Sequence, residues 1–204
     1  MTAKKLRPED SNIASDAFGP TPSQTVGPYF HQGLIVPSDA GGLDSGGLGN
    51  RLFPEQKGGR IEVRGRVLDA DGECVPDALV ELWQANAAGR YGGPEGFGRS
   101  DTRHPGQEFV FQTIKPGAVV QPGSPVLAPH LNVWLGLRGL LTHLRTRIYF
   151  EDEDNSHDPV LLLVSEARRA SLIARQGGAA PSTYRLDIHL QGTDETVFFA
   201  FALH

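Results

Sequence analysis

Short runs in which apolar and polar residues alternate fill the chain from residue 61 onward. Residues 61–67 and 78–83 form the first two runs, with Asp71-Gly72 between them, and residues 86–89 follow the second as a turn. Because Asp-Gly favours a tight turn between antiparallel strands, this stretch predicts a hairpin whose two strands pair. The number and shortness of the runs predict an all-β fold, a β-sandwich. The remaining predicted strands cover residues 108–114, 131–138, 146–150, 184–191 and 196–202.

One stretch departs from the strand pattern. Apolar residues in the segment 165–176 recur near helical spacing, and Gly177-Gly178 follows as a C-terminal cap. The sequence therefore predicts one short helix. The apolar positions that carry this prediction are Ala167, Ala170, Leu172, Ile173 and Ala174.

Residues 1–60 carry almost no periodic apolar pattern and are rich in glycine and proline. They are predicted to form a long N-terminal arm, and residues 61–204 the sandwich domain. Long structureless segments are uncommon in compact proteins unless they pack on a partner or on their own domain. We therefore expect the arm to form part of an interface.

Composition limits the cell compartment and the class of ligand. The chain has 204 residues and 39% hydrophobic content, which suits one domain with a sizeable core. Cys74 is the single cysteine, residues 1–10 lack the apolar stretch of a signal peptide, and no apolar run is long enough for a membrane helix. These features predict a cytoplasmic protein. The net charge of -5 argues against nucleic acid, so an anionic ligand would need a locally placed arginine or lysine.

Several peptides resemble one known family. They are residues 21–29 (TPSQTVGPY), 78–86 (ALVELWQAN), 113–117 (TIKPG), Tyr149-Phe150 and 184–188 (YRLDI), and they occur in the family's order. On these peptides the chain is similar to the intradiol ring-cleaving dioxygenases. The resemblance implies a β-sandwich and a non-haem ferric ion. In the protocatechuate branch of the family, it implies a catalytic β chain paired with a related α chain.

The resemblance implies that this chain is of the α type and does not hold the iron. Catalytic relatives use His-x-His on a strand, and a spacing of two places both imidazoles on one face. The matching triplet here is His130-Leu131-Asn132, so a neutral amide stands where the second imidazole is expected. Ferric iron prefers anionic oxygen donors beside imidazole. Fe(III) would thus belong to a homologous β chain in an α–β hetero-oligomer.

The two ligand tyrosines of the family are not matched either. The one expected after the Lys-Pro-Gly turn is replaced by Val119. The loop that carries the other is short, and Tyr91 aligns better with a tyrosine that is not a ligand. Val119, His130 and Asn132 are therefore interpreted as vestigial positions, with no metal ligand and no catalytic residue on this chain.

A substrate-pocket role is predicted for two other segments. In the protocatechuate branch, the segment that matches Thr25, Gly27, Pro28 and Tyr29 borders the β chain's active site. Arg138 matches a position beside the same cavity, where a guanidinium could bind the carboxylate of a catechol substrate. Tyr91 carries a weaker prediction of the same kind.

The resemblance thus implies a share in converting 3,4-dihydroxybenzoate and O₂ to 3-carboxy-cis,cis-muconate. Two alternatives stay open from the sequence alone. One is a self-sufficient intradiol dioxygenase for another catechol, which would need a complete ligand set. The other is a non-enzymatic scaffold or binding domain that uses the degenerate cavity.

Overall fold

The computed structural model describes residues 24–27, 34–35, 49–56, 59–177 and 182–200. Within these residues the strands run in the order β3-β2-β5-β6-β7-β8-β1-β4, and β9 pairs with β1. The strands are β1 (Arg60–Leu68), β2 (Leu79–Gln84), β3 (Phe97–Asp101), β4 (Glu108–Ile114), β5 (His130–Gly136), β6 (Leu144–Phe150), β7 (Ile173–Gln176), β8 (Thr183–Arg185) and β9 (Ile188–His189). The helical segments are the 3-10 helices η4 (Pro94–Gly96) and η5 (Ala170–Leu172) and the helices α2 (Pro159–Leu162) and α3 (Glu166–Arg169).

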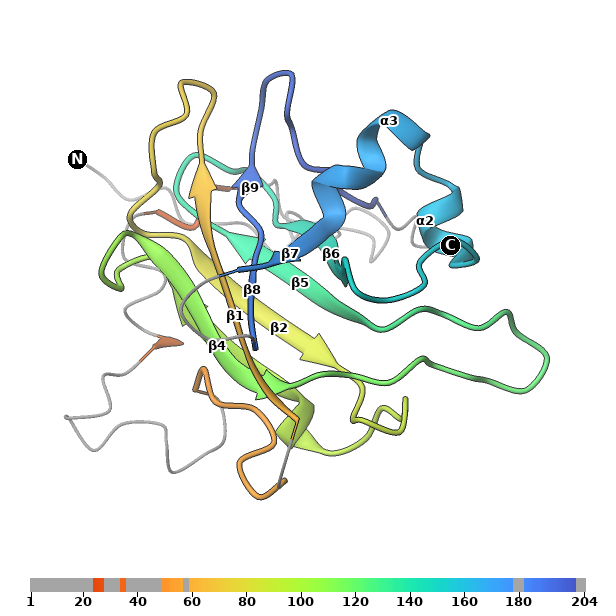
Figure 1. Ribbon diagram of the computed structural model, residues 1–204. Coiled ribbons are helices and arrows are strands. Elements are labelled where there is room, and N and C mark those ends of the chain that lie inside the picture. The colour runs from red at the N-terminus through yellow and green to blue at the C-terminus, as the bar shows by residue number, and fades with distance from the viewer. Residues whose placement is uncertain (1–23, 28–33, 36–48, 57–58, 178–181, 201–204) are drawn as a thin grey trace, which may run out of the picture.

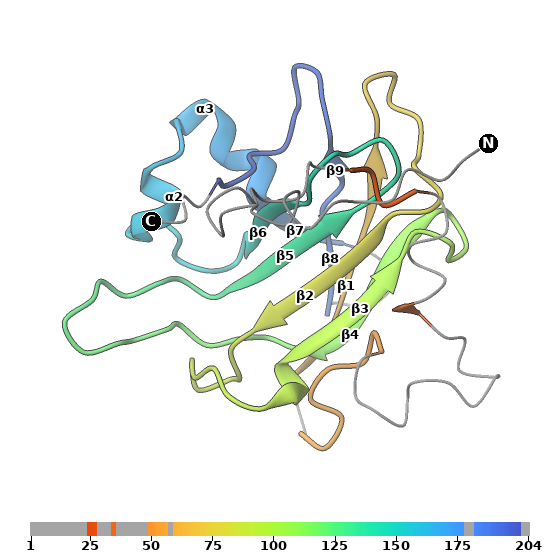
Figure 2. The same cartoon turned by 180° about the vertical axis from the view of Figure 1, so that it is seen from behind.

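The sheet folds back on itself to form two facing layers. Strands β1, β4 and β8 lie nearest the viewer in Figure 1, whereas β2, β3 and β5 lie nearest in the reverse view of Figure 2. The main apolar core lies between the layers and includes Phe109, Phe111, Leu131 and Phe150. The all-β prediction is confirmed. No helix in the described part of the chain is long and apolar enough to cross a membrane.

Alternation along β5 and β6 separates the core from an outer face. Leu131, Val133 and Leu135 of β5 are buried in the core, and Asn132 between them is partly exposed on the opposite side. Successive side chains of a strand point to opposite faces, so β5 carries a core face and a polar face. Tyr149 of β6 lies on that outer side, in a second apolar cluster with Ala128, Leu161, Val164 and Leu172.

The predicted hairpin between β1 and β2 is wrong. The Asp71-Gly72 turn does form locally, since Gly72 N donates to Asp69 O at 3.2 Å and Leu68 bridges Cys74. However, β1 pairs with β4 along one edge and with β8 and β9 along the other. No edge of β1 is left for β2, which pairs with β3 and β5 in the other layer.

The predicted helix over residues 165–176 is only half right. The segment begins with α3 and η5, but from Ile173 it is strand β7, which pairs in parallel with β6 and antiparallel with β8. Sheet pairing outweighs the weak helical spacing there, so Gly177 follows a strand and does not cap a helix. Gly178 lies outside the described residues. Three elements were missed: strand β3, helix α2 and the 3-10 helix η4.

The predicted C-terminal strand is not found in residues 196–200, and residues 201–202 lie outside the described residues. The segment nevertheless contacts β6, because Phe199 N donates to Arg145 O at 2.8 Å and Thr146 Oγ1 donates to Val197 O at 2.8 Å.

The end of the predicted arm packs onto the sandwich itself. Leu52 and Phe53 are buried in the core, and Arg51 bridges Gln112 of β4. The Arg60 guanidinium donates to Phe53 O at 3.0 Å and to Leu52 O at 3.1 Å. Packing on the domain's own surface therefore accounts for this part of the arm.

Gly65 of β1 is expected to be essential for the close packing of β8 and β9 against β1. A Cβ there would lie 1.8 Å from Leu186 O and 2.7 Å from Phe109 Cζ. Gly65→Ala should lower the free energy of unfolding by more than about 2 kcal/mol, since backbone must move to make room. Denaturant unfolding followed by circular dichroism measures this. Gly177→Ala, where nothing lies within 4 Å of the added Cβ, is the matched control and should change stability little. Equal effects of the two variants would contradict the packing argument.

Candidate functional site

Three polar side chains meet at the beginning of β5. Tyr91 Oη lies 3.1 Å from His130 Nε2, and Asn132 Nδ2 donates to Tyr91 Oη at 2.7 Å. His130 is 1% exposed, and Tyr91 and Asn132 are half-buried. Three of the residues singled out from the sequence are therefore in direct contact.

The strand register places these side chains on the outer face. His130 and Asn132 are two residues apart on β5, so both point away from the core. Asn132 lies opposite Trp83 of β2, and its Nδ2 also donates to Trp83 O at 3.3 Å. The Trp83 ring stacks on Tyr91 with centroids 6.3 Å apart and an interplanar angle of 7°.

Tyr91 is positioned by the predicted turn after β2. Asn86 Oδ1 accepts from Ala88 N at 3.0 Å and Arg90 N at 3.1 Å, and Gly89 has a φ of 70°. The polar side chain thus fixes the backbone of the turn, which brings Tyr91 back over the end of β5.

Strand β6 supplies a cation to the same face. Arg147 lies opposite Asn132 in the β5–β6 register, and its Nε donates to Asn132 Oδ1 at 3.1 Å. Its Nη1 lies 3.4 Å from Tyr149 Oη. The Tyr149 hydroxyl donates in turn to Asp158 Oδ1 at 3.0 Å.

Asp158 connects this polar chain to helix α2. Its Oδ1 accepts from Val160 N and Leu161 N at 2.9 Å, which caps the helix, and its Oδ2 accepts from Ala128 N at 2.9 Å. Asp158 is 2% exposed, so these donors replace the water that a buried carboxylate would lose.

The imidazole of His130 is held neutral. Burial lowers the pKa of His130 to about 4, and the nearby Arg147 charge acts in the same direction. Its Nδ1 lies 2.7 Å from Ala128 O, which can only accept, so Nδ1 carries the proton and Nε2 presents a lone pair. The proton between Tyr91 and His130 therefore belongs to the Tyr91 hydroxyl.

Both tyrosines of the cluster are held as neutral phenols. Burial raises the pKa of Tyr91, although Asn132 and the Arg147 charge oppose this. Burial likewise raises the pKa of Tyr149 well above its ordinary value. Burial therefore favours the protonated form of both phenols over the tyrosinate.

Val119 lies beside the turn that carries Tyr91. It is 3% exposed and bridges Leu127 within the loop between β4 and β5, which projects from the body in Figure 1. A Cβ on Gly89 would lie 3.4 Å from Val119 Cα and 1.8 Å from Ala118 O. An apolar side chain thus packs near the polar cluster and offers no donor atom.

The other predicted pocket residues meet at the opposite end of β5. Thr25 Oγ1 accepts from Gly139 N at 2.8 Å and from Gly27 N at 3.4 Å, which joins the arm to the turn after Arg138. The Arg138 side chain is 54% exposed, and its Nε lies 3.1 Å from Asp77 Oδ2. Pro28 and Tyr29 lie outside the described residues. Thr25, Gly27 and Arg138 thus form one group, which we call the Thr25–Arg138 rim.

The structure therefore divides the predicted site residues between two places. Tyr91, Val119, His130 and Asn132 gather at the beginning of β5, whereas the Thr25–Arg138 rim lies beyond its end. Among the described residues, these two groups do not line a common pocket.

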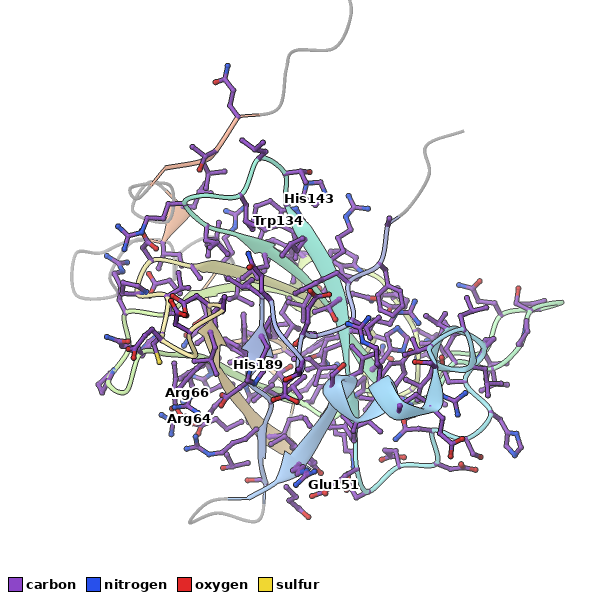
Figure 3. All side chains as sticks on the ribbon, turned by 90° about the horizontal axis from the view of Figure 1, so that it is seen from above. Arg64, Arg66, Trp134, His143, Glu151 and His189 are labelled. Atoms are coloured by element: carbon purple, nitrogen blue, oxygen red, sulfur yellow. The ribbon has the colours of Figure 1, made fainter. Side chains whose placement is uncertain are left out.

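A cavity of about 350 Å³ adjoins the polar cluster on the outer face. Aromatic side chains and arginines line it, among them Trp83, Phe97, Trp134 and Arg147. Trp134 stacks on His143 with centroids 5.5 Å apart, and the two residues are neighbours in Figure 3.

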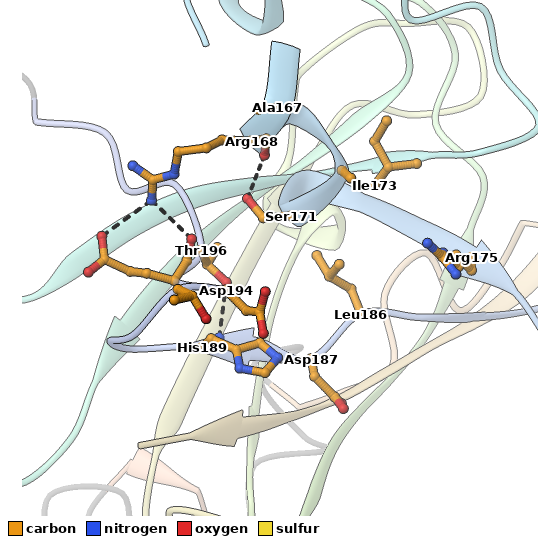
Figure 4. Close-up of a pocket in the computed structure, with 13 residues that line it drawn as sticks. Ala167, Arg168, Ser171, Ile173, Arg175, Leu186, Asp187, His189, Asp194 and Thr196 are labelled. Carbon is orange, nitrogen blue, oxygen red and sulfur yellow. Dashed lines mark hydrogen bonds and ion pairs between the residues drawn. The ribbon is translucent and has the colours of Figure 1, made fainter. Parts of the chain in front are cut away.

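A larger cavity of about 500 Å³ lies between α3 and β9 (Figure 4). Three of its charged residues already have partners within the chain, since Arg168 pairs with Glu195 at 3.3 Å and Asp187 pairs with Arg66. None of the sequence-predicted site residues lines it. We therefore take the polar cluster at β5 as the candidate site.

Sequence reasoning missed Arg147, Tyr149 and Asp158. The alternation of Arg145, Arg147 and Tyr149 does indicate one polar face on β6, but only the pairing with β5 shows that Arg147 reaches Asn132. Within the described residues, no group of three or more histidine, cysteine, aspartate or glutamate side chains could hold a metal ion.

Burial of a neutral His130 predicts a stability that falls with acid. The pKa is about 4 in the folded chain and near 6.5 when unfolded. The folded state therefore binds fewer protons between these values, so its stability is complete above pH 6.5 and falls as the pH drops toward 4. Between pH 6.5 and 4, the free energy of unfolding of the native chain should fall by about 3 kcal/mol relative to that of His130→Gln. Urea unfolding of both proteins between pH 7 and 4 checks this, and parallel pH curves would contradict it.

Comparison with known proteins gives relatives that match most of the chain. It is 42% identical over 193 residues to the protocatechuate 3,4-dioxygenase alpha chain of Burkholderia cepacia, covering 88% of this chain and 96% of the relative. It is 40% identical over 193 residues to the protocatechuate 3,4-dioxygenase alpha chain of Pseudomonas putida. This match covers 89% of this chain and 96% of the relative. The protocatechuate 3,4-dioxygenase beta chain of Burkholderia cepacia is 38% identical over 163 residues, covering 70% of this chain and 68% of the relative.

Solved structures share the fold at low sequence identity. An intradiol ring-cleavage dioxygenase from Tetranychus urticae gives a TM-score of 0.56 at 16% identity, covering 70% of this chain and 85% of that chain. Catechol 1,2-dioxygenase from Pseudomonas arvilla C-1 gives a TM-score of 0.53 at 18% identity. This match covers 72% of this chain and 58% of that chain. The sequence model of the family described as Dioxygenase matches residues 27–192. The chain therefore belongs to this dioxygenase family, as its peptides resembling the intradiol enzymes predicted.

Proposed function

We propose that this chain is the α subunit of a protocatechuate 3,4-dioxygenase. A homologous β chain holds ferric iron, and the hetero-oligomer converts 3,4-dihydroxybenzoate and O₂ to 3-carboxy-cis,cis-muconate. The proposal is supported by the two alpha-chain relatives, each matched over almost its whole length, and by the beta-chain relative. The complex would act in the cytoplasm, where the single Cys74 stays reduced.

The residues at the β5 cluster do not fit ferric iron. The lone pair of His130 Nε2 accepts from Tyr91, and Asn132 provides a neutral amide whose oxygen accepts from Arg147. Val119 contributes no donor, and Arg147 adds a positive charge. We therefore assign no catalytic step to this cluster.

The observation that carries the proposal is the contact of Thr25 Oγ1 with Gly139 N at 2.8 Å. Thr25 and Gly139 are 114 residues apart in the sequence. The resemblance implied a pocket role for the segment that begins at Thr25 and, independently, for Arg138, the residue before Gly139. They lie together on the exposed Thr25–Arg138 rim, away from the chain's own cluster. A rim in that place would serve a substrate site on a neighbouring chain.

Arg138 would supply the positive charge of this rim. Its Nε is anchored to Asp77, which is 8% exposed, while more than half of the arginine side chain stays accessible. An anchored guanidinium is oriented before substrate arrives and can form two parallel hydrogen bonds with a carboxylate. Protocatechuate carries a carboxylate, and catechol does not.

The metal content of the purified full chain tests whether the iron is held by the β chain and not by this chain. Expressed without a β chain, it should contain far less than one iron per chain and lack the visible colour of ferric tyrosinate. Co-expression with a β chain should give one iron per αβ pair. Elemental analysis and absorption spectra decide this. One tightly bound iron on the isolated chain would favour a self-sufficient dioxygenase, and failure to associate with any β chain would favour a scaffold.

Arg138→Ala in the assembled enzyme should raise the KM for protocatechuate roughly tenfold, which corresponds to about 1.4 kcal/mol of binding energy. The KM for catechol should change far less, because catechol has no carboxylate to lose. Steady-state kinetics with both substrates measure this. Arg103→Ala removes another partly exposed arginine, one that pairs with Asp101 at 2.6 Å, and serves as the matched control. Equal changes for the two substrates would show that Arg138 has no role in binding the carboxylate.

A further inference from the structure

Two chains of hydrogen bonds in the β5 cluster begin at Arg147. A guanidinium has only donors, so each chain of hydrogen bonds that begins there has a fixed direction. In one branch, Arg147 Nε donates to Asn132 Oδ1, and Asn132 Nδ2 donates to Tyr91 Oη. The Tyr91 hydroxyl then donates to His130 Nε2, and His130 Nδ1 donates to Ala128 O.

The second branch runs along β6 to the same backbone residue. Arg147 Nη1 donates to Tyr149 Oη, and the Tyr149 hydroxyl donates to Asp158 Oδ1. Asp158 Oδ2 accepts from Ala128 N. The two branches therefore end on the carbonyl and the amide of one residue. The loop thus links Arg147, Asn132, Tyr91, His130, Tyr149 and Asp158 through hydrogen bonds to their neighbours.

Arg147 and the Trp83 carbonyl together fix the orientation of Asn132. Its amide could in principle face either way, but Arg147 Nε offers a proton on one side, and Trp83 O and Tyr91 Oη lie on the other. The oxygen must face the arginine, so the NH₂ group must face Tyr91. This leaves the Tyr91 hydroxyl to donate to His130, which occupies the lone pair that a metal would need.

We propose that Arg147 is an internal cation that takes the place of a metal ion in this cluster and keeps metal ions out of it. It does so in two ways. Its charge repels a second cation near Tyr91, His130 and Asn132. Its first branch, through Asn132, leaves the Tyr91 hydroxyl donating to the lone pair of His130 Nε2. A metal bound here would have to release the Tyr91 proton and take that lone pair.

The proposal goes beyond the proposed function, because it concerns only hydrogen bonds within this chain. It would hold even if the chain had no β partner. It also predicts that restoring the missing imidazole is not enough to restore a metal site.

Metal binding by four variants of the full chain tests the proposal, with Co²⁺ as the probe. Asn132→His supplies a third donor beside Tyr91 and His130 but retains Arg147. Asn132→His/Arg147→Gln should bind Co²⁺ at least tenfold more tightly than Asn132→His, and binding should release the Tyr91 proton as the phenol becomes a ligand. Adding Tyr91→Phe to the double variant should remove that proton release. Titration calorimetry in two buffers gives both quantities.

Arg145 provides the matched control for charge. It lies two residues earlier on β6, opposite Trp134, and outside both branches. Asn132→His/Arg145→Gln should bind Co²⁺ no more than about threefold more tightly than Asn132→His, as expected for loss of a more distant charge. If this variant gained as much as the one that lacks Arg147, or if removing Arg147 brought no gain, the proposal would be overturned.

A second measurement covers the case in which the double variant does not fold. In the otherwise native chain, Arg147→Gln should raise the pKa of His130, because the arginine's charge contributes to lowering it. Arg145→Gln should leave it nearly unchanged. Nuclear magnetic resonance titration of the imidazole measures both. An unchanged His130 titration without Arg147 would show that the two groups are not coupled and would overturn the proposal.

Discussion

The need to satisfy buried polar groups on the outer face of β5 and β6 governs the structure around the candidate site. His130 and Asp158 are almost completely buried, and an unpaired polar group in such a place costs a few kcal/mol. The loop of hydrogen bonds from Arg147 to Ala128 removes that cost. It also joins strands β5 and β6, the turn that carries Tyr91 and the start of helix α2. One set of hydrogen bonds thus fixes the relative positions of four elements.

The parts of this arrangement that depend on local spacing could be predicted from the sequence. His130 and Asn132 are two residues apart, which placed them on one face of a strand, and residues 86–89 indicated the turn before Tyr91. Arg147 could not be found in the same way. Its role depends on the β5–β6 register, which opposes Asn132 to Arg147, and a register is set by contacts between distant segments.

The same limit explains the errors in the fold. The Asp71-Gly72 signal is local and correct, but it says nothing of which strands pair beyond the turn. Both edges of β1 are taken by β4, β8 and β9, so β2 joins the other layer. In residues 173–176, pairing with β6 and β8 outweighs a weak helical pattern. The missed and mistaken strands are those that tertiary pairing decides, whereas the missed helix α2 has a local start at Asp158 and Pro159.

The separation of the β5 cluster from the Thr25–Arg138 rim suits a chain whose role in chemistry lies at a neighbour's site. A metal-free cluster still has to be filled, because an empty polar cavity would weaken the sheet and the helix cap together. A positive charge on Arg147 meets that need with groups the chain already carries. Under the proposed function, the opposite end of β5 presents the anchored Arg138 to the substrate of a neighbouring chain. The two ends of one strand would then have different roles, because Arg147 satisfies the polar groups at the first end and leaves the second end exposed to a partner.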